Sequence, residues 1–140
     1  MDATAIRQYI TQTFANVNVL DASGGSFFFY DTEQKFPFAT LTINDEYDQE
    51  SNLSRPDVFR LNVGVSKQTF QSLFGEAGTG GGHDFTALDR LMPHPVYGKM
   101  YWVCVLNPGA ETLKTVQGLL AEAYDMAVRK RTRTNPAGEA

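Results

Sequence analysis

Hydrophobic positions at the two ends of the chain recur at helical spacing. Ile6, Ile10 and Phe14 fall four residues apart and predict a first helix over residues 3 to about 15. A longer run with the same period predicts a helix over residues 111–131. The apolar members of that run are Leu113, Val116, Leu120, Ala123, Tyr124 and Ala127. Each pattern leaves one face polar, so we expect both helices to pack one side against another part of the protein.

Between these helices, short apolar runs alternate with turn-forming residues. The runs that predict strands are residues 17–22, 27–30, 38–43, 58–65 and 101–106. Ser23-Gly24-Gly25-Ser26 separates the first two runs and predicts a hairpin turn. Short strands in hairpin order indicate a mainly antiparallel sheet of about five strands, with the N-terminal helix and the long C-terminal helix packed on one face. We therefore expect a single α+β domain over residues 1–133 and a flexible tail over residues 134–140.

Three connecting segments interrupt this pattern. Residues 44–56 are acidic and show no periodicity, which predicts a long loop. Ser66 is a good N-cap for a short helix that ends at Gly75. The glycine-rich residues 78–82 predict a flexible connection after that helix.

The arm that follows holds both histidines. Residues 85–92 predict one or two helical turns, with Asp84 placed to cap them. Pro93 and Pro95 flank His94, and two prolines so spaced require extended backbone. A polar arm therefore leads into the apolar strand that carries the single tryptophan and the single cysteine.

Composition narrows the class of protein. The chain has 140 residues with 42% hydrophobic and 20% charged side chains, which is typical of a globular domain. It has no apolar run of ~18 residues and no basic-then-apolar N-terminus, so we expect a cytoplasmic protein without a membrane partner. Up to residue 128 the net charge is −7, from eight basic and fifteen acidic side chains. Such an acidic body disfavours DNA as a partner.

The motifs for cofactor and metal chemistry are incomplete. The glycines at 78–82 are followed by His83-Asp84, where a phosphate-binding loop needs a lysine and a hydroxyl residue. His83 and His94 are eleven residues apart, which is not a recognised zinc spacing. The acidic loop lacks the glycine and the terminal glutamate of a calcium loop. We therefore expect no cofactor, no metal and no identifiable catalytic residue.

Two residues of the fifth predicted strand have competing interpretations. Cys104 lies between two valines, and a thiol in that setting is expected to be a small buried hydrophobic group. Trp102 either anchors the core or lines a pocket, and we favour the core. His94 is expected to have a hydrogen-bonded packing role rather than a catalytic one.

Three stretches resemble a known family. They are Phe59-Arg60-Leu61-Asn62-Val63-Gly64-Val65-Ser66, then residues 95–105 around Tyr101-Trp102-Val103, and then residues 119–128 around Ala123-Tyr124. Together they cover roughly residues 57–131 and resemble the YjbR/MmcQ-like family. The resemblance implies a frataxin-like α+β sandwich. It also implies DNA binding, which is attributed to the family largely by fold analogy, and it supplies no catalytic residues. The acidic loop and the glycine-rich segment depart from the family pattern and indicate an uncharacterised branch.

We place the candidate binding surface on the arm at residues 83–97, together with Tyr47 and Arg60. Aromatic, histidine and charged side chains on irregular backbone are where binding groups tend to collect. The candidate ligand-binding residues are Tyr47, Arg60, His83, Asp84, Asp89, Arg90, His94 and Tyr97.

Three functions remain open from the sequence. The first is a non-enzymatic binding domain with an unknown ligand, where the resemblance implies DNA and the acidic charge favours a small molecule or a protein. The second is a small enzyme that uses His94 or His83 as a general base beside Asp84, Asp89 or Glu46. The third is a structural or oligomerisation subunit. Whether the chain is a monomer or a dimer is left open.

Overall fold

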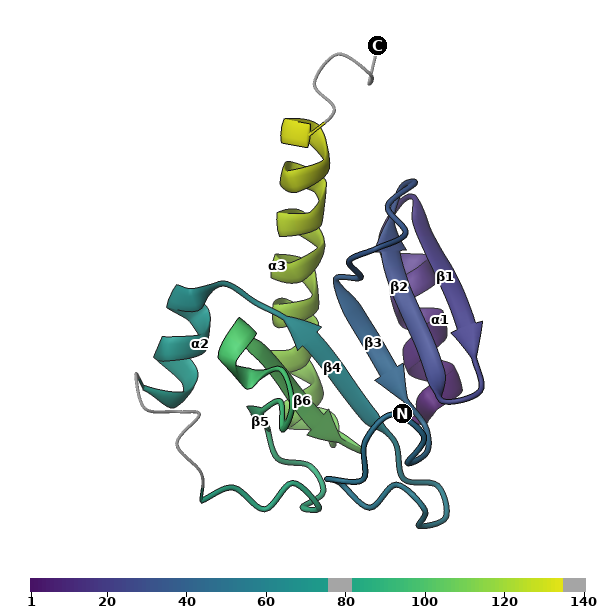
Figure 1. The fold of residues 1–140 in the computed structure, drawn as a ribbon, viewed down its shortest axis with the longest axis vertical. Helices are drawn as coiled ribbons and strands as arrows, with labels where there is room; N and C mark the ends of the chain where they lie inside the picture. Colours follow the sequence, from purple (N-terminus) through teal and green to yellow (C-terminus); the bar gives the residue numbers. More distant parts are fainter. Residues whose placement is uncertain (76–81, 135–140) are drawn as a thin grey trace.

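The computed structural model describes residues 1–75 and 82–134 of the chain, which form one sheet with the N-terminal helix and the long C-terminal helix packed against it (Figure 1). The helices are α1 (Ala3–Thr13), α2 (Lys67–Phe74), the short 3-10 helix η1 (Gly98–Met100) and α3 (Ala110–Thr134). The strands are β1 (Val17–Ala22), β2 (Gly25–Tyr30), β3 (Ala39–Thr42), β4 (Arg60–Gly64), β5 (Met92–Pro93) and β6 (Trp102–Leu106). The flexible tail was predicted over residues 134–140, and Thr134 is the last residue of α3. Residues 135–140 of this tail and residues 78–81 of the predicted glycine loop lie outside the described residues.

The sheet has six strands in the order β1-β2-β3-β4-β6-β5, and every neighbouring pair is antiparallel. The predicted α+β class and antiparallel sheet are therefore confirmed, with β5 as a strand that the sequence pattern did not predict. A two-residue strand is too short to show any periodicity. β5 forms because Met92 and Pro93 lie beside Cys104 and Val103 at the outer edge of β6.

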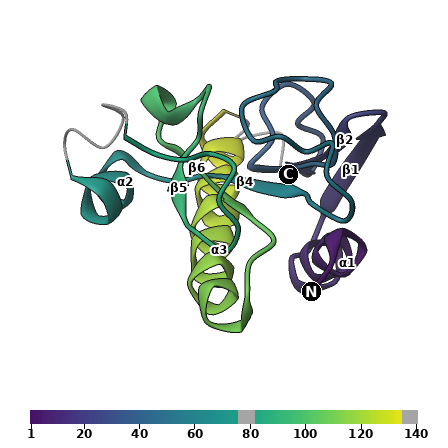
Figure 2. The ribbon, with the colours of Figure 1, turned by 90° about the horizontal axis from the view of Figure 1, so that it is seen from below.

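The main core lies between the sheet and the two long helices. Seen from below, α1 and α3 cover one face of the sheet, and the loops lie on the other face (Figure 2). Strand residues alternate between faces, so Leu61 and Val63 of β4 point into the helical layer. The buried residues that they join are Ile6 and Ile10 of α1, Phe28, Ala39 and Leu41 of the early strands, and Val116, Leu120 and Ala123 of α3. The predicted packing of both helices on one face is confirmed.

Local chemistry explains where the first two helices begin. The Asp2 carboxylate accepts a hydrogen bond from the Ala5 backbone N–H at 2.8 Å, and the Ser66 hydroxyl accepts one from the Thr69 N–H at 3.1 Å. Both contacts satisfy a donor that the first helical turn leaves free. The prediction that Ser66 caps α2 is confirmed.

The predicted helical turns at residues 85–92 are wrong. Asp84 instead accepts hydrogen bonds from the Thr86 N–H at 3.0 Å and the Thr86 hydroxyl at 2.6 Å, which forms a turn rather than a helix cap. Asp89 then has a φ of 56°, and its N–H donates to the Leu106 carbonyl at 2.6 Å. Because the Asp89 N–H is bonded to β6, it is not available for a helical hydrogen bond, and the chain continues from Asp89 into β5.

Candidate functional site

The face of the sheet opposite α1 and α3 carries a buried polar network centred on Arg60. Arg60 is 1% exposed, and the Asp48 carboxylate accepts from its Nη1 at 3.0 Å and its Nη2 at 2.7 Å. Its Nη1 also donates to the Ser51 hydroxyl, and its Nε donates to Asn62 Oδ1 at 2.8 Å. The guanidinium is thus paired and hydrogen-bonded, as a buried charge must be. Burial is the largest single effect on the pKa of Asp48 and would raise it, but the hydrogen bonds and the positive charge of Arg60 together hold the pKa below its usual value.

His94 completes this network as a buried neutral side chain. Its Nδ1 accepts from the backbone N–H groups of Val96 and Tyr97, both at 3.0 Å, so the single ring proton of the neutral imidazole is on Nε2. Nε2 lies 3.5 Å from Nη2 of Arg60, which is a contact between two donors. Burial, and then the charge of Arg60, lower the pKa of His94 to about 3. His94 therefore has the hydrogen-bonded packing role expected from the sequence, and its nitrogens are not free to accept a proton from a substrate.

The network fixes the acidic loop over the sheet. Asp48 and Ser51 both come from this loop, and Leu53 packs beside Met92 and Cys104 in a second, smaller apolar cluster. Arg55 donates to the Thr86 carbonyl at 2.9 Å and so joins the loop to the arm. Cys104 is fully buried, and burial raises its pKa to about 12, which confirms it as a packed, unreactive thiol. The acidic loop therefore packs over this face of the sheet, and its Asp48 and Ser51 side chains point inward to the buried Arg60.

The other sequence-predicted site residues are dispersed. Tyr97 is half exposed and its ring centroid lies 5.1 Å from that of His94, so it alone joins the Arg60–His94 pair. Tyr47 packs on Phe27. The remaining candidates contact other parts of the protein. The His83 ring packs near the rings of Phe74 and Phe85, and Asp84 forms its turn with Thr86. Asp89 accepts from the Gly109 N–H at 2.7 Å, and Arg90 is exposed.

The two carboxylates of the arm have structural partners that explain their pKa values. Hydrogen bonds from the Thr86 hydroxyl and N–H lower the pKa of Asp84. The Gly109 N–H and then the Thr112 side chain lower the pKa of Asp89, which ties the arm to the start of α3. Both carboxylates hold backbone in place, and neither is hydrogen-bonded to His94, whose Nδ1 accepts from backbone N–H groups of the arm. The arm therefore does not assemble the candidate residues into one site.

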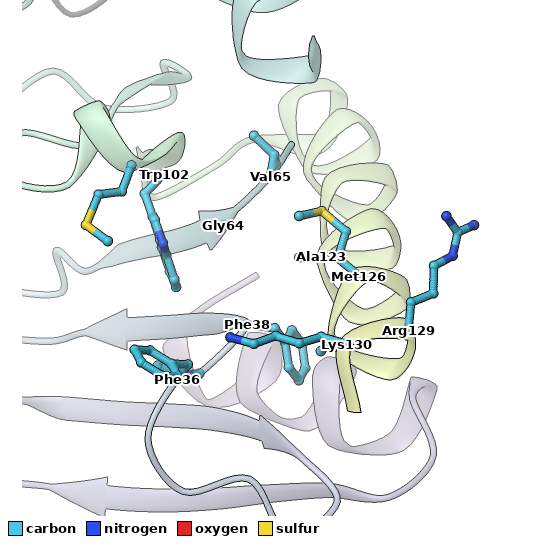
Figure 3. A pocket seen from close by; sticks show the side chains of 12 residues that line it. Phe36, Phe38, Gly64, Val65, Trp102, Ala123, Met126, Arg129 and Lys130 are labelled. Atoms are coloured by element: carbon cyan, nitrogen blue, oxygen red, sulfur yellow. The ribbon is translucent and has the colours of Figure 1, made fainter. Parts of the chain in front are cut away.

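A groove of about 450 Å³ lies elsewhere, between the second half of α3 and the end of the sheet (Figure 3). Its volume falls in the range of small-molecule sites, ~300–1,000 Å³. Its lining comes from four separate stretches of chain: Phe36, Pro37 and Phe38; Gly64 and Val65; Met100 and Trp102; and Ala123, Met126, Ala127, Arg129 and Lys130. Most of these side chains are apolar, and Phe36, Met100 and Met126 are 56%, 65% and 38% exposed. Exposed apolar groups gathered in a hollow are a common sign of a binding site.

Trp102 forms one wall of this groove. It lies opposite Gly64 in the β4–β6 ladder, and a Cβ on Gly64 would come within 2.9 Å of Cε2 of the indole. The missing side chain of Gly64 therefore makes the space for the tryptophan ring. Trp102 is half-buried and faces the groove, so the expectation that it packs in the core is wrong. The alternation of strand residues gave the face of the sheet on which Trp102 lies, but not the fact that its ring lines a groove.

The basic end of α3 forms the rim. Lys130 reaches across toward Phe36, with its Nζ 4.4 Å from the ring centroid, whereas Arg129 points away from the groove and pairs with Asp125 at 2.8 Å (Figure 3). Glu33 lies close enough that Lys130 contributes to its lowered pKa, after the larger effect of the Lys35 and Phe36 backbone N–H groups. The groove thus pairs apolar walls with a positively charged edge.

Sequence reasoning did not find this groove because its residues are far apart in the chain. The available signals were weak: an exposed Phe36 before Pro37, two methionines and a basic helix end. Each has an ordinary explanation when taken alone. Only the packing of α3 across the ends of β3 and β4 brings them together.

The described residues hold neither a candidate metal-binding cluster nor a candidate membrane-spanning helix. Within residues 1–75 and 82–134, no group of three or more His, Cys, Asp or Glu side chains is placed to hold a metal ion. None of the helices in those same ranges combines the length and the apolar character needed to cross a membrane.

Fold and groove together define a small α+β protein with one antiparallel sheet, a helical layer and an apolar groove at one end. Residues 1–136 match the sequence profile of DUF6194, a family of unknown function, and the chain belongs to that family. No curated protein matches it.

The fold has a counterpart among solved structures. A crystal structure of a protein from Pseudomonas syringae, a Northeast Structural Genomics Consortium target, is similar over 91% of this chain and 99% of its own length. The two sequences are 15% identical and the TM-score is 0.57, so the likeness shows the fold alone. The matched family is not the YjbR/MmcQ-like family, and the resemblance to the latter stays a prediction.

Proposed function

We propose that this protein is a non-enzymatic binding domain and that it binds a small, largely apolar molecule in the groove between α3 and the sheet. The observation that carries this proposal is the groove of about 450 Å³ itself, with Phe36, Met100 and Met126 exposed along its walls and the half-buried Trp102 among its lining residues. Burying such surface against a ligand contributes roughly 25 cal/mol per Å² of apolar area. Methionine side chains adapt to ligands of different shape, and two of them line this groove.

The contacts of Arg60 and His94 under the acidic loop support a structural role for these two residues rather than a second ligand-binding site. Four of the five N–H donors of Arg60 have protein acceptors, and the imidazole Nδ1 of His94 accepts from backbone. A ligand entering there would have to displace these contacts and leave a buried charge unpaired, which costs about 3–5 kcal/mol. The same contacts speak against His94 as a general base.

The DNA binding implied by the YjbR/MmcQ-like resemblance is the runner-up. The basic residues at the end of α3 favour it, and the −7 charge of residues 1–128 opposes it. A groove lined mainly by apolar side chains offers little to a phosphate backbone.

A neutral fluorescent probe tests the proposal without involving charge. N-phenyl-1-naphthylamine, which emits strongly only in apolar surroundings, is titrated into the wild-type protein and two variants. Met126→Asp places a carboxylate in the groove wall, and Leu73→Asp makes the same change on α2 at a residue of matching exposure, 37% against 38%. We expect saturable binding by the wild type and by Leu73→Asp, and at least tenfold weaker binding by Met126→Asp.

Absence of saturable binding, or equal binding by the two variants, would overturn the proposal. A parallel mobility-shift assay with duplex DNA at low salt distinguishes DNA binding from the proposed binding of a small molecule. A shift at micromolar protein that depends on Arg129 and Lys130 but not on Met126 would favour DNA instead.

A further inference from the structure

The polar side chains that line the groove are all hydrogen-bond donors. They are the indole of Trp102, the ammonium of Lys130 and the guanidinium of Arg129. No Asp, Glu, Asn, Gln, Ser or Thr side chain stands among the described lining residues. A ligand that fits this lining has to bring the acceptor atoms itself.

Two of the three donors are directed into the groove. The Trp102 side chain points down toward Phe36 and Phe38, and Lys130 extends across from α3, whereas Arg129 turns outward (Figure 3). In the described part of the chain, the structure gives the Trp102 Nε1–H no acceptor, although the ring is half-buried. This N–H is not among the buried unpaired polar atoms of the described residues, so it is open to solvent and available to an acceptor atom of a bound ligand.

The charge around the groove opposes that of the rest of the protein. Lys35 and Lys130 both lie near the Phe36 ring, with Nζ to centroid distances of 5.5 and 4.4 Å. Glu33 faces the same edge, and Asp125 is engaged with Arg129. The basic end of α3 thus lies against an otherwise acidic body, and the resulting field attracts anions to this end of the molecule.

We infer that the ligand of the groove is an organic anion: an apolar, preferably aromatic body that carries one carboxylate or similar acidic group. This inference rests on the proposed function. The body lies against Phe36, Met126 and the Trp102 indole. The acidic group lies at the rim, where it accepts from the Lys130 ammonium, and an acceptor atom of the ligand takes the Trp102 N–H. A charge-assisted hydrogen bond of this kind is roughly twice as strong as a neutral one.

A matched pair of ligands tests this inference. 2-Naphthoate and 2-naphthamide share one apolar body and differ in charge, and isothermal titration calorimetry gives the affinity of each. We expect the wild-type protein to bind the naphthoate about tenfold more tightly, a factor that corresponds to a single charge-assisted hydrogen bond. The preference should shrink as sodium chloride is raised, because the rim is exposed to solvent.

Two variants locate the charge. Lys130→Met keeps the aliphatic stem over Phe36 and removes the ammonium, so we expect it to bind both ligands with the affinity of the wild type for the amide. Lys114→Met removes an exposed lysine from the same helix outside the groove and should keep the preference for naphthoate.

Each other outcome has a definite meaning. Equal binding of the two ligands by the wild type overturns the inference and leaves the groove as an apolar site. A naphthoate preference that Lys130→Met retains also overturns it, because the anion is then held elsewhere. If neither ligand binds and the neutral probe fails as well, the proposed function itself is wrong.

Discussion

Arg60 is the largest side chain that the protein buries completely, and it carries a charge. Its place on β4 puts it on the face opposite to Leu61 and Val63, away from α1 and α3. Asp48 and Ser51 of the acidic loop offset the cost of burying this charge by accepting hydrogen bonds from the Arg60 guanidinium. A buried pair of this kind is weak evidence for stability on its own, but removing one partner leaves a buried charge unpaired.

Replacing Asp48 should therefore be strongly destabilising. We expect Asp48→Asn to lower the free energy of unfolding by about 3 kcal/mol, measured by urea denaturation. Asp21→Asn is the matched control, because Asp21 also pairs with an arginine, Arg7, at 2.7 Å, but with side chains that are 40% and 56% exposed. That exposed pair should contribute less than ~1 kcal/mol. Similar losses in both variants would contradict the role given to the network.

His94 should make the stability of the protein depend on pH. The folded pKa is about 3 and the unfolded value is 6.5, so between these values the unfolded chain binds a proton that the folded chain does not. The free energy of unfolding then rises with pH in this window, by up to about 1.4 kcal/mol per unit from this residue. Acidification from pH 6.5 toward 4 should destabilise the protein.

His94→Asn isolates this contribution, because its Oδ1 can still accept from the Val96 and Tyr97 N–H groups while the side chain does not titrate. We expect the midpoint of urea unfolding to fall less steeply between pH 6.5 and 4 in this variant than in the wild type. Parallel curves for the two proteins would show that His94 is not held neutral in the fold.

At the scale of elements, the β4–β6 pair and α3 position the groove. Gly64 and Trp102 are opposite one another in the ladder, and the indole occupies the space where a side chain of residue 64 would lie. α3 continues to Thr134, so its second half reaches past the strands that it covers and forms the far wall (Figure 1).

A methyl group on Gly64 should disturb this arrangement. Its Cβ would lie 2.9–3.2 Å from three atoms of the indole, so we expect Gly64→Ala to displace the ring, change the Trp102 emission and cost about 1–3 kcal/mol of stability. Gly118→Ala serves as the control. No atom lies within 4 Å of its Cβ position, and alanine at this exposed position in the middle of α3 should raise stability by about 0.5–1 kcal/mol. Unchanged emission in Gly64→Ala would argue against the described wall.

At the scale of the whole molecule, sequence periodicity was sufficient for the architecture. The apolar period of α1 and α3 and the hairpin order of the strands predicted the layers, because those patterns reflect which face each element buries. β5 was missed and a helix was predicted instead at residues 85–92, because the path of that arm depends on contacts with Leu106 at the end of β6 and Gly109 just before α3. Such long-range contacts leave no local pattern.

The candidate site was predictable only in part. Arg60 and His94 were correctly placed near one another, but their burial and the separate hydrogen bonds that satisfy each of them could not be predicted from residue types. The groove depends on four distant stretches meeting at the end of α3, and its clearest member, Trp102, was expected in the core. The face of a strand residue follows from alternation, whereas its exposure depends on what covers that face.

The most direct test of the account is to map where a ligand binds. Two-dimensional ¹H–¹⁵N spectra of the labelled wild-type protein, titrated with 2-naphthoate, report every backbone amide and the single indole N–H of Trp102. The account predicts that the indole signal and the amides of Gly64, Val65 and Met126 shift together and saturate. Shifts that gather instead around Arg60, His94 and Tyr97, with the indole signal unmoved, would contradict it and return the binding site to the arm.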